Sequence, residues 1–257
     1  MTSRTLQGKT ALIAGGSKNL GAAFAKDLAE HGIACVGIHY NSASSLEEAE
    51  ATKKQVQDAG TRVFLYQADL ADPGAVEDLF QSAKADMGGI DLAINCAGVL
   101  KKNKIIDMSE DDLDATLNIN IRAGFLFIKH AGIALNDNGN ILTIGTSLVG
   151  GFQADYGLYA GSKAALEHFT RAAAKELGHR GISANCLAPG PINNSFFFAT
   201  SPQAAANHLK SLTALGDQAP VGLSEMEDIA PWARFLATEG WWMTGQTILL
   251  NGGLFTK

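Results

Sequence analysis

The sequence predicts an α/β protein built on a single Rossmann-type, doubly wound parallel sheet of about seven strands, with helices on both faces. Short apolar runs alternate along the chain with longer segments whose apolar residues recur at helical spacing. A glycine-rich turn separates the first apolar run from the first helix. The 257 residues are 46% hydrophobic and 18% charged, and no linker is visible. We therefore expect residues 1–257 to form one domain around a full core.

Composition excludes several classes of protein. The formal net charge of -6, without a basic stripe, argues against non-specific binding to nucleic acid. Residues 1–4 lack the apolar run of a signal peptide, and no apolar stretch is long enough to span a membrane. Cys35, Cys96 and Cys186 lie in or at the ends of predicted strands and form no CxxC motif, so we expect packed thiols, no metal site and no disulfide. These features predict a cytoplasmic protein.

The amino-terminal half supplies four of the strands. Short apolar runs typical of buried strands lie at residues 9–14, 33–40, 62–67 and 91–95. Between them we expect a helix that begins at Leu20, a charged helix at residues 45–59, and a helix capped by Asp72 with Pro73 as its first residue.

The carboxyl-terminal half supplies three more strands, at residues 140–145, 182–187 and 246–250. Ser109, with Asp112 three residues later, would cap a long helix that contains Asn120. Residues 193–224 form a loop-and-helix region headed by Phe196-Phe197-Phe198, which either fills a gap beneath the region or lines an apolar pocket. A last helix is expected at residues 226–238.

One predicted helix, from Leu158 onward, carries a pair of residues suited to proton transfer. Tyr159 and Lys163 are four residues apart, so their side chains lie on one face of that helix. A nearby cation favours the phenolate form of tyrosine, whose ordinary pKa is about 10. Lowering that pKa by roughly 3 units corresponds to about 4 kcal/mol and would make Tyr159 a usable proton donor or acceptor near pH 7. The alternative is an ordinary amphipathic helix.

Polar and small residues follow the carboxyl ends of the predicted strands. The glycine-rich turn, Asn95, Ser147 and Pro189 all stand at such positions. In a doubly wound sheet ligands bind beyond this edge, near the point where the strand order reverses. We therefore expect these residues to converge on one site.

From Lys9 to its end, the chain resembles the short-chain dehydrogenase/reductase family. Residues 14–21 resemble the family's TGxxxGxG cofactor turn, with Asn19 in place of its middle glycine. The other matching motifs, in family order, are Asp69-Leu70, Asn95-Cys96-Ala97-Gly98 (usually NNAG), Asn120, Ser147, Tyr159-x-x-x-Lys163, Pro189-Gly190 and Asn251-Gly252-Gly253.

The resemblance implies hydride transfer between a nicotinamide cofactor and a carbonyl or alcohol carbon. It implies that Tyr159 exchanges the proton, that Lys163 lowers its pKa and holds the nicotinamide ribose, that Ser147 binds the carbonyl oxygen and that Asn120 holds a relay water.

The hydroxyl residue is ambiguous. Ser147 precedes Tyr159 by 12 residues and fits the family's SxxG pattern through Gly150. The usual spacing is one residue longer and would select Thr146. We favour Ser147.

The resemblance also implies a set of cofactor-binding residues. These are Gly15, Ser17, Lys18, Asn19, Leu20, Gly21, His39, Tyr40, Asn41, Ser42, Ala68, Asp69, Leu70, Asn95, Ala97, Gly98, Tyr159, Lys163, Pro189, Gly190, Ile192 and Asn194.

The end of the second strand predicts a preference for NADPH over NADH. An NAD-selective protein places a carboxylate there to bind the ribose 2′-hydroxyl. This chain has no carboxylate until Glu47. It offers His39, Asn41 and Ser42 as donors to a 2′-phosphate, and Lys18 as a nearby positive charge.

Together these features predict an NADPH-dependent reductase of ketones or aldehydes that bear an apolar side. The alternatives are an NAD-dependent alcohol or sugar-alcohol dehydrogenase and, more remotely, a cofactor-binding regulator without activity. The resemblance further suggests a homo-oligomer, either a tetramer or a dimer.

Overall fold

A seven-stranded parallel sheet forms the centre of the protein, in a computed structural model that describes residues 4–256. Its strands are β1 (Thr10–Ala14), β2 (Cys35–Tyr40), β3 (Arg62–Gln67), β4 (Leu92–Asn95), β5 (Asn140–Ile144), β6 (Ser183–Pro189) and β7 (Thr247–Leu250). The spatial order is β3-β2-β1-β4-β5-β6-β7, and every neighbouring pair is parallel. The chain winds outward from β1 and then crosses to β4. The predicted doubly wound fold is confirmed.

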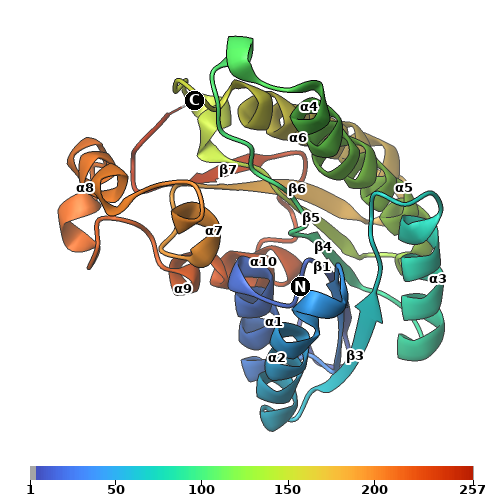
Figure 1. Ribbon diagram of the computed structural model, residues 1–257. Helices are drawn as coiled ribbons and strands as arrows, with labels where there is room; N and C mark the ends of the chain where they lie inside the picture. The colour runs from blue at the N-terminus through green and yellow to red at the C-terminus, as the bar shows by residue number, and fades with distance from the viewer. Residues whose placement is uncertain (1–3, 257) are drawn as a thin grey trace.

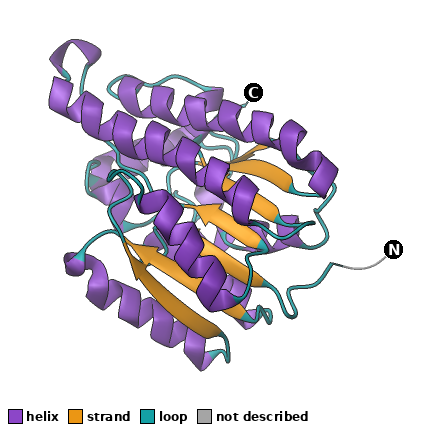
Figure 2. Ribbon diagram, turned by 90° about the vertical axis from the view of Figure 1, so that its right-hand side faces the viewer, coloured by secondary structure: helices purple, strands orange, loops and turns teal. Residues whose placement is uncertain are grey.

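Helices cover both faces of the sheet, as Figure 2 shows. One layer contains α3 (Ala75–Met87), α5 (Gly124–Ala134) and α6 (Gly157–Leu177), and the other contains α1 (Asn19–Glu30), α2 (Leu46–Asp58), α9 (Met226–Ile229) and α10 (Pro231–Ala237). Alternate residues of β1 point to opposite layers, because side chains along a strand alternate in direction. Leu12 packs in the core under α3 and α5, and Ile13 packs in the core under α1.

The long helix predicted after Ser109 is present but irregular. Ser109 caps it as expected, because its Oγ accepts a hydrogen bond from the Asp112 N–H at 3.1 Å. The helix begins as α4 (Glu110–Thr116), passes through π-helical turns at Leu117–Ala123 and continues as α5. The π-helical segment contains Asn120, and such segments are frequent at functional sites.

Two predicted helix boundaries were wrong. Helix α3 begins at Ala75 and not at Pro73, because Gly74 has a left-handed backbone with φ of 83° and cannot belong to the helix. The segment at residues 226–238 is divided into α9 and α10 at Pro231, whose ring nitrogen cannot donate a helical hydrogen bond.

Residues 193–224 project beyond the carboxyl end of β6 (Figure 1). They include the short helix α7 (Ser195–Phe198) and the longer helix α8 (Gln203–Leu212). Ala206, Leu209 and Leu223 form a small apolar cluster of their own there. This region is therefore a satellite of the main core.

Some side-chain chemistry is limited by the fold. The three cysteines are free thiols, with Cys35 and Cys186 buried and Cys96 half-buried. Within residues 4–256, no three metal-ligating side chains of the His, Cys, Asp or Glu type come together. Over the same residues, no helix has both the length and the apolarity to cross a bilayer.

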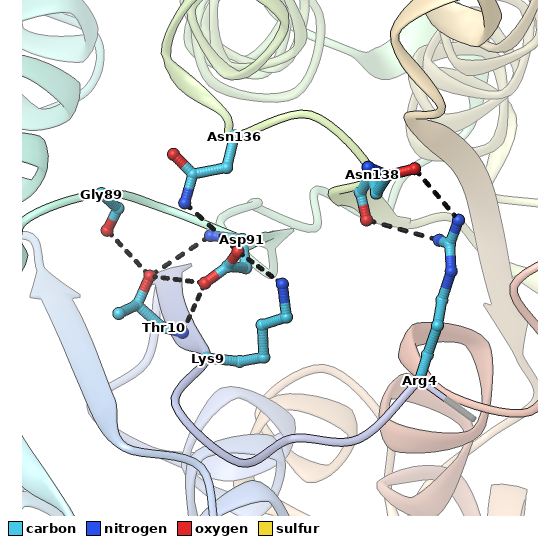
Figure 3. Close-up of polar contacts among 7 residues, drawn as sticks. All are labelled: Arg4, Lys9, Thr10, Gly89, Asp91, Asn136 and Asn138. Carbon is cyan, nitrogen blue, oxygen red and sulfur yellow. Dashed lines mark hydrogen bonds and ion pairs between the residues drawn. The ribbon is translucent and has the colours of Figure 1, made fainter. Parts of the chain in front are cut away.

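At the amino ends of the strands, one carboxylate ties β1 to β4 (Figure 3). Asp91 precedes β4 and accepts hydrogen bonds from the Thr10 N–H at 3.0 Å and the Lys9 ammonium at 2.9 Å. It also accepts one from the Asn136 amide, at 3.2 Å, in the loop between α5 and β5. The Thr10 hydroxyl donates to the Gly89 carbonyl at 2.8 Å. This network fixes the relative register of the two central strands.

We expect Asp91→Asn to destabilise the fold without impairing the carboxyl edge of the sheet. The asparagine amide would place N–H donors against the Lys9 ammonium and the Thr10 N–H, which are themselves donors. Leaving a buried hydrogen-bonding group without a partner costs about 1–3 kcal/mol of stability. Urea unfolding measures this loss. Lys9→Met is the matched control and should cost under about 1 kcal/mol, since that ammonium is largely exposed. Unchanged stability of Asp91→Asn would contradict the structural role of the network.

Candidate active site

A cavity of about 680 Å³ opens at the carboxyl ends of the strands. The turns after β1, β2, β3, β4, β5 and β6 all contribute to its wall, together with α6 and α7. The predicted residues that line it are Gly15, Ser17, Lys18, Asn19, Leu20, Gly21, His39, Tyr40, Asn41, Asp69, Leu70, Ala97, Gly98, Ser147, Tyr159, Lys163, Pro189, Gly190, Ile192 and Asn194. The structure thus brings most of the predicted site together.

Four predicted site residues, Ser42, Ala68, Asn95 and Asn120, do not line the cavity. Asn95 shapes the turn after β4, since its Oδ1 accepts a hydrogen bond from the Ala97 N–H at 3.1 Å. The Ser42 hydroxyl pairs with that of Ser44 at 2.8 Å. Ala68 accepts through its carbonyl the contact of His39 described below, and Asn120 is also described below.

The glycine-rich turn fits the close approach of a dinucleotide. A Cβ atom on Gly21 would lie 2.1 Å from the Gly15 carbonyl oxygen, so this position accepts only glycine. Gly15 has φ of 68°, and a Cβ there would lie 3.0 Å from the Ala97 nitrogen. Across the cavity, a Cβ on Gly98 would lie 3.1 Å from the Lys163 ammonium. Backbone rather than side chains thus faces the space where a pyrophosphate and a flat ring would bind.

Asn19 replaces the middle glycine of the turn without distorting it. Its φ is 49°, in the left-handed region that asparagine tolerates better than other side chains. Its Oδ1 accepts a hydrogen bond from the Ser195 hydroxyl at 3.0 Å. The substitution therefore links the cofactor turn to α7.

The structure corrects the predicted role of His39 as a donor to phosphate. The ring is 2% exposed. Its Nδ1 accepts a hydrogen bond from the Gly15 N–H at 3.1 Å, and its Nε2 lies 2.9 Å from the Ala68 carbonyl. A neutral imidazole has one donor and one acceptor, and both are used. His39 therefore holds the glycine-rich turn against the end of β3.

Burial lowers the pKa of His39 below its ordinary value, because the charged ring would lose its hydration. Below pH 6.5 the unfolded chain binds a proton that the folded protein excludes, so this residue makes stability fall with decreasing pH. We expect His39→Asn to be less acid-sensitive than wild type between pH 7 and pH 5. One group contributes at most about 1.4 kcal/mol per pH unit. Urea unfolding across this range measures the difference, and parallel wild-type and variant curves would contradict it.

Tyr159 and Lys163 lie one turn apart on α6, as predicted, and are 8% and 4% exposed. The Lys163 Nζ donates a hydrogen bond to the Ile144 carbonyl at the end of β5, at 2.7 Å, and lies 6.0 Å from the centre of the Tyr159 ring. Burial lowers the pKa of Lys163 to about 8.

That Lys163 lowers the pKa of Tyr159 stays a prediction, and burial acts against it. Burial raises the phenol pKa above its ordinary value, and the Tyr156 phenol adds to the effect. The opposing influence comes from the Thr146 hydroxyl. Tyr159 is therefore protonated at neutral pH.

Both neighbouring hydroxyls, those of Thr146 and Ser147, line the cavity. Ser147 begins a short 3₁₀ turn, Ser147–Gly150, and the Thr146 hydroxyl accepts a hydrogen bond from the Leu148 N–H at 3.4 Å. The Thr146 hydroxyl also opposes the rise in the pKa of Tyr159. This influence favours Thr146, where the sequence pattern favours Ser147, so both stay candidates for binding the carbonyl oxygen.

Asn120 acts through its side chain as a clamp. Its Oδ1 accepts from the Val99 N–H, and its Nδ2 donates to the Val99 carbonyl and to the Ser162 hydroxyl, each at 2.9 Å. Both amide hydrogens are therefore used and cannot bind a relay water. The clamp joins the loop after β4 to α6, beside Lys163.

Asn194 also has a structural task. Its Oδ1 accepts a hydrogen bond from the Phe197 N–H at 3.0 Å and so caps α7. The aromatic triplet after it serves both of the uses considered from the sequence. Phe196 and Phe197 line the cavity, whereas Phe198 packs on the small cluster, 5.1 Å from the Phe197 ring centre.

The sequence motifs missed several residues of the wall. Tyr156 lines the cavity. Its hydroxyl lies 3.4 Å from the Ser201 hydroxyl, and the Lys102 ammonium lies 5.0 Å from the centre of its ring. Gln153 and Phe255 also line the cavity. They stand in loops without a periodic pattern, so only the fold brings them to the site.

Comparison with known proteins decides the family. Residues 14–255 match a family model described as Enoyl-(Acyl carrier protein) reductase. A Picea abies protein named short-chain type dehydrogenase/reductase is 34% identical, over 96% of this chain and 93% of its own length. The protein belongs to the short-chain dehydrogenase/reductase family. It is accordingly an NAD(P)-dependent oxidoreductase of that family.

Other members of the family extend the comparison. An Arabidopsis thaliana protein named NADPH-dependent aldehyde reductase-like protein, chloroplastic, is 33% identical over 96% of this chain and 94% of its own. A solved structure of a Burkholderia cenocepacia putative dehydrogenase with bound NADP is 47% identical, with a TM-score of 0.97, and the match covers 100% of this chain and 97% of that one.

Proposed function

We propose that this family member is an NADPH-dependent reductase of ketones or aldehydes, with Tyr159 as the proton donor. The observation that carries the proposal is the buried Tyr159 phenol on the wall of the cavity, one helical turn from Lys163, in a cavity that Thr146 and Ser147 also line. The names of the Arabidopsis and Burkholderia relatives, which mention NADPH and bound NADP, support the choice of cofactor.

Different residues around the cavity would bind different parts of a nicotinamide cofactor. The backbone of the glycine-rich turn would hold the pyrophosphate, Asp69 and Leu70 the adenine, and Lys163 the nicotinamide ribose. When bound, NADPH would supply the hydride. The protein supplies position, hydrogen bonds and a proton.

The proton chemistry follows from the geometry. A substrate carbonyl oxygen beside Tyr159 and Thr146 would accept a hydrogen bond from each hydroxyl. As negative charge develops on that oxygen, Tyr159 would transfer its proton to it. Lys163 is cationic below its pKa of about 8 and would stabilise the phenolate left behind. The Tyr159 phenol is protonated at neutral pH, as proton donation in the direction of reduction requires, while burial weakens it as an acid and the charge on Lys163 would offset that effect.

The wall of the cavity that faces residues 193–224 is apolar. Leu148, Phe196, Phe197, Leu209 and Leu254 line it. We infer a substrate whose carbonyl bears an apolar group that reaches this wall. The homo-oligomer and the cytoplasmic location stay predictions of the sequence.

We expect Tyr159→Phe to reduce kcat by more than about tenfold, because removal of the hydroxyl deletes the proton donor and leaves the ring in place. Cofactor affinity should be nearly unchanged. The assay follows NADPH oxidation with a panel of ketones and aldehydes. Tyr156→Phe removes the other phenol of the cavity and should cost far less. Retention of more than a tenth of wild-type kcat by Tyr159→Phe would refute Tyr159 as the proton donor.

We expect Thr146→Ala to cost on the order of 10²-fold in kcat, the scale for loss of one positioned donor, and Ser147→Ala far less. The reason is the influence of the Thr146 hydroxyl on the pKa of the Tyr159 phenol. Steady-state kinetics of both variants give the ranking. The opposite ranking would restore Ser147 as the hydroxyl that binds the carbonyl.

A further inference from the structure

Lys18, on the wall of the cavity, forms an ion pair with Glu48, which does not itself line the cavity. Lys18 and Asn41 line the cavity, from the glycine-rich turn and from the end of β2. The Lys18 Nζ lies 2.9 Å from the Glu48 Oε1, and the two side chains are 51% and 41% exposed. Lys101 and Lys163, the other lysines that line the cavity among residues 4–256, come from the loop after β4 and from α6. Of these three lysines, Lys18 alone belongs to the glycine-rich turn, which follows β1, the strand that pairs with β2.

The Glu48 carboxylate is held in place but incompletely satisfied. It stands in the first turn of α2, where the helix dipole favours a negative charge. One oxygen accepts from Lys18, while Oε2 is buried and has no hydrogen-bond partner among the described residues. A carboxylate oxygen that is shielded from water and unpaired is an unfavourable neighbour for a second anion.

We propose that Glu48 is a specificity-determining residue that competes with the cofactor 2′-phosphate for Lys18. The proposal rests on the proposed NADPH preference. A phosphate monoester carries about −1.5 to −2 charges at pH 7, so it attracts Lys18 and repels Glu48. If Lys18 binds the 2′-phosphate, NADPH would divide or break the Lys18–Glu48 ion pair, whereas NADH, which has a 2′-hydroxyl, would leave it intact. Glu48 thus limits the affinity for NADPH selectively.

The size of the effect follows from the exposure of the pair. An ion pair between partly exposed side chains is worth about 0.2–1 kcal/mol. Removal of the negative charge should therefore tighten NADPH binding by about 1.4- to fivefold. Because solvent-exposed charges are screened, the gain should shrink as the salt concentration rises toward 1 M.

The test measures dissociation constants of NADPH and NADH by calorimetry for wild type, Glu48→Gln and Glu47→Gln. Glutamine keeps the shape of the side chain and can still accept from Lys18. Glu47, exposed on the same turn of α2, is the matched control. We expect Glu48→Gln to bind NADPH more tightly at low salt and NADH as wild type does, and Glu47→Gln to show a smaller effect. In a Lys18→Ala background the gain from Glu48→Gln should diminish.

Three results would overturn the inference: unchanged or weaker NADPH binding by Glu48→Gln, equal tightening toward both cofactors, or an equal gain from Glu47→Gln. Thermal melting of each variant shows that it is folded. The wild-type ratio of the two dissociation constants tests the proposed function separately. Equal wild-type affinities with a selective gain in Glu48→Gln would refute the NADPH preference and keep the role of Glu48.

Discussion

The hydrogen bond from the Lys163 ammonium to the Ile144 carbonyl sets the geometry on which the site depends. It joins the amino-terminal part of α6 to the carboxyl end of β5. Further along α6, the Thr170 hydroxyl lies 2.8 Å from the Thr143 hydroxyl. Leu166 packs against Gly124 of α5 and leaves no room there for a side chain at position 124. Helix α6 is thus fixed to the sheet at two places along its length, and the position of the helix determines where the Tyr159 side chain lies.

That arrangement explains why the protonation states differ from a simple pair of neighbours. Burial raises the pKa of the phenol, whereas the Lys163 ammonium, bound to a carbonyl and 6.0 Å from the phenol ring centre, favours the phenolate. The same burial lowers the pKa of Lys163. The phenol therefore holds its proton at neutral pH, and it gives that proton up more easily while Lys163 is charged.

Local patterns predicted the sheet well and the site only in part. Strand positions follow from apolar runs, and the shared face of Tyr159 and Lys163 follows from helical spacing. Contacts between segments that are far apart in the chain produce no such pattern in the sequence. The use of both nitrogens of His39 depends on the turn after β1 and on β3, and the preference for Thr146 over Ser147 depends on where α6 presents its phenol. Burial, which decides the direction of each pKa shift, is a property of the folded chain.

Residues 193–224 are joined to this framework at both the glycine-rich turn and α6. Ser195 at the start of α7 donates to Asn19 in the glycine-rich turn, and Ser201 lies beside the Tyr156 hydroxyl at the start of α6. The region also has its own apolar cluster, so part of its packing is separate from the main core. Side chains of that cluster can therefore vary while the main core that positions Tyr159 stays unchanged. The link between α7 and the glycine-rich turn depends on Asn19, at the position where the family motif has a glycine.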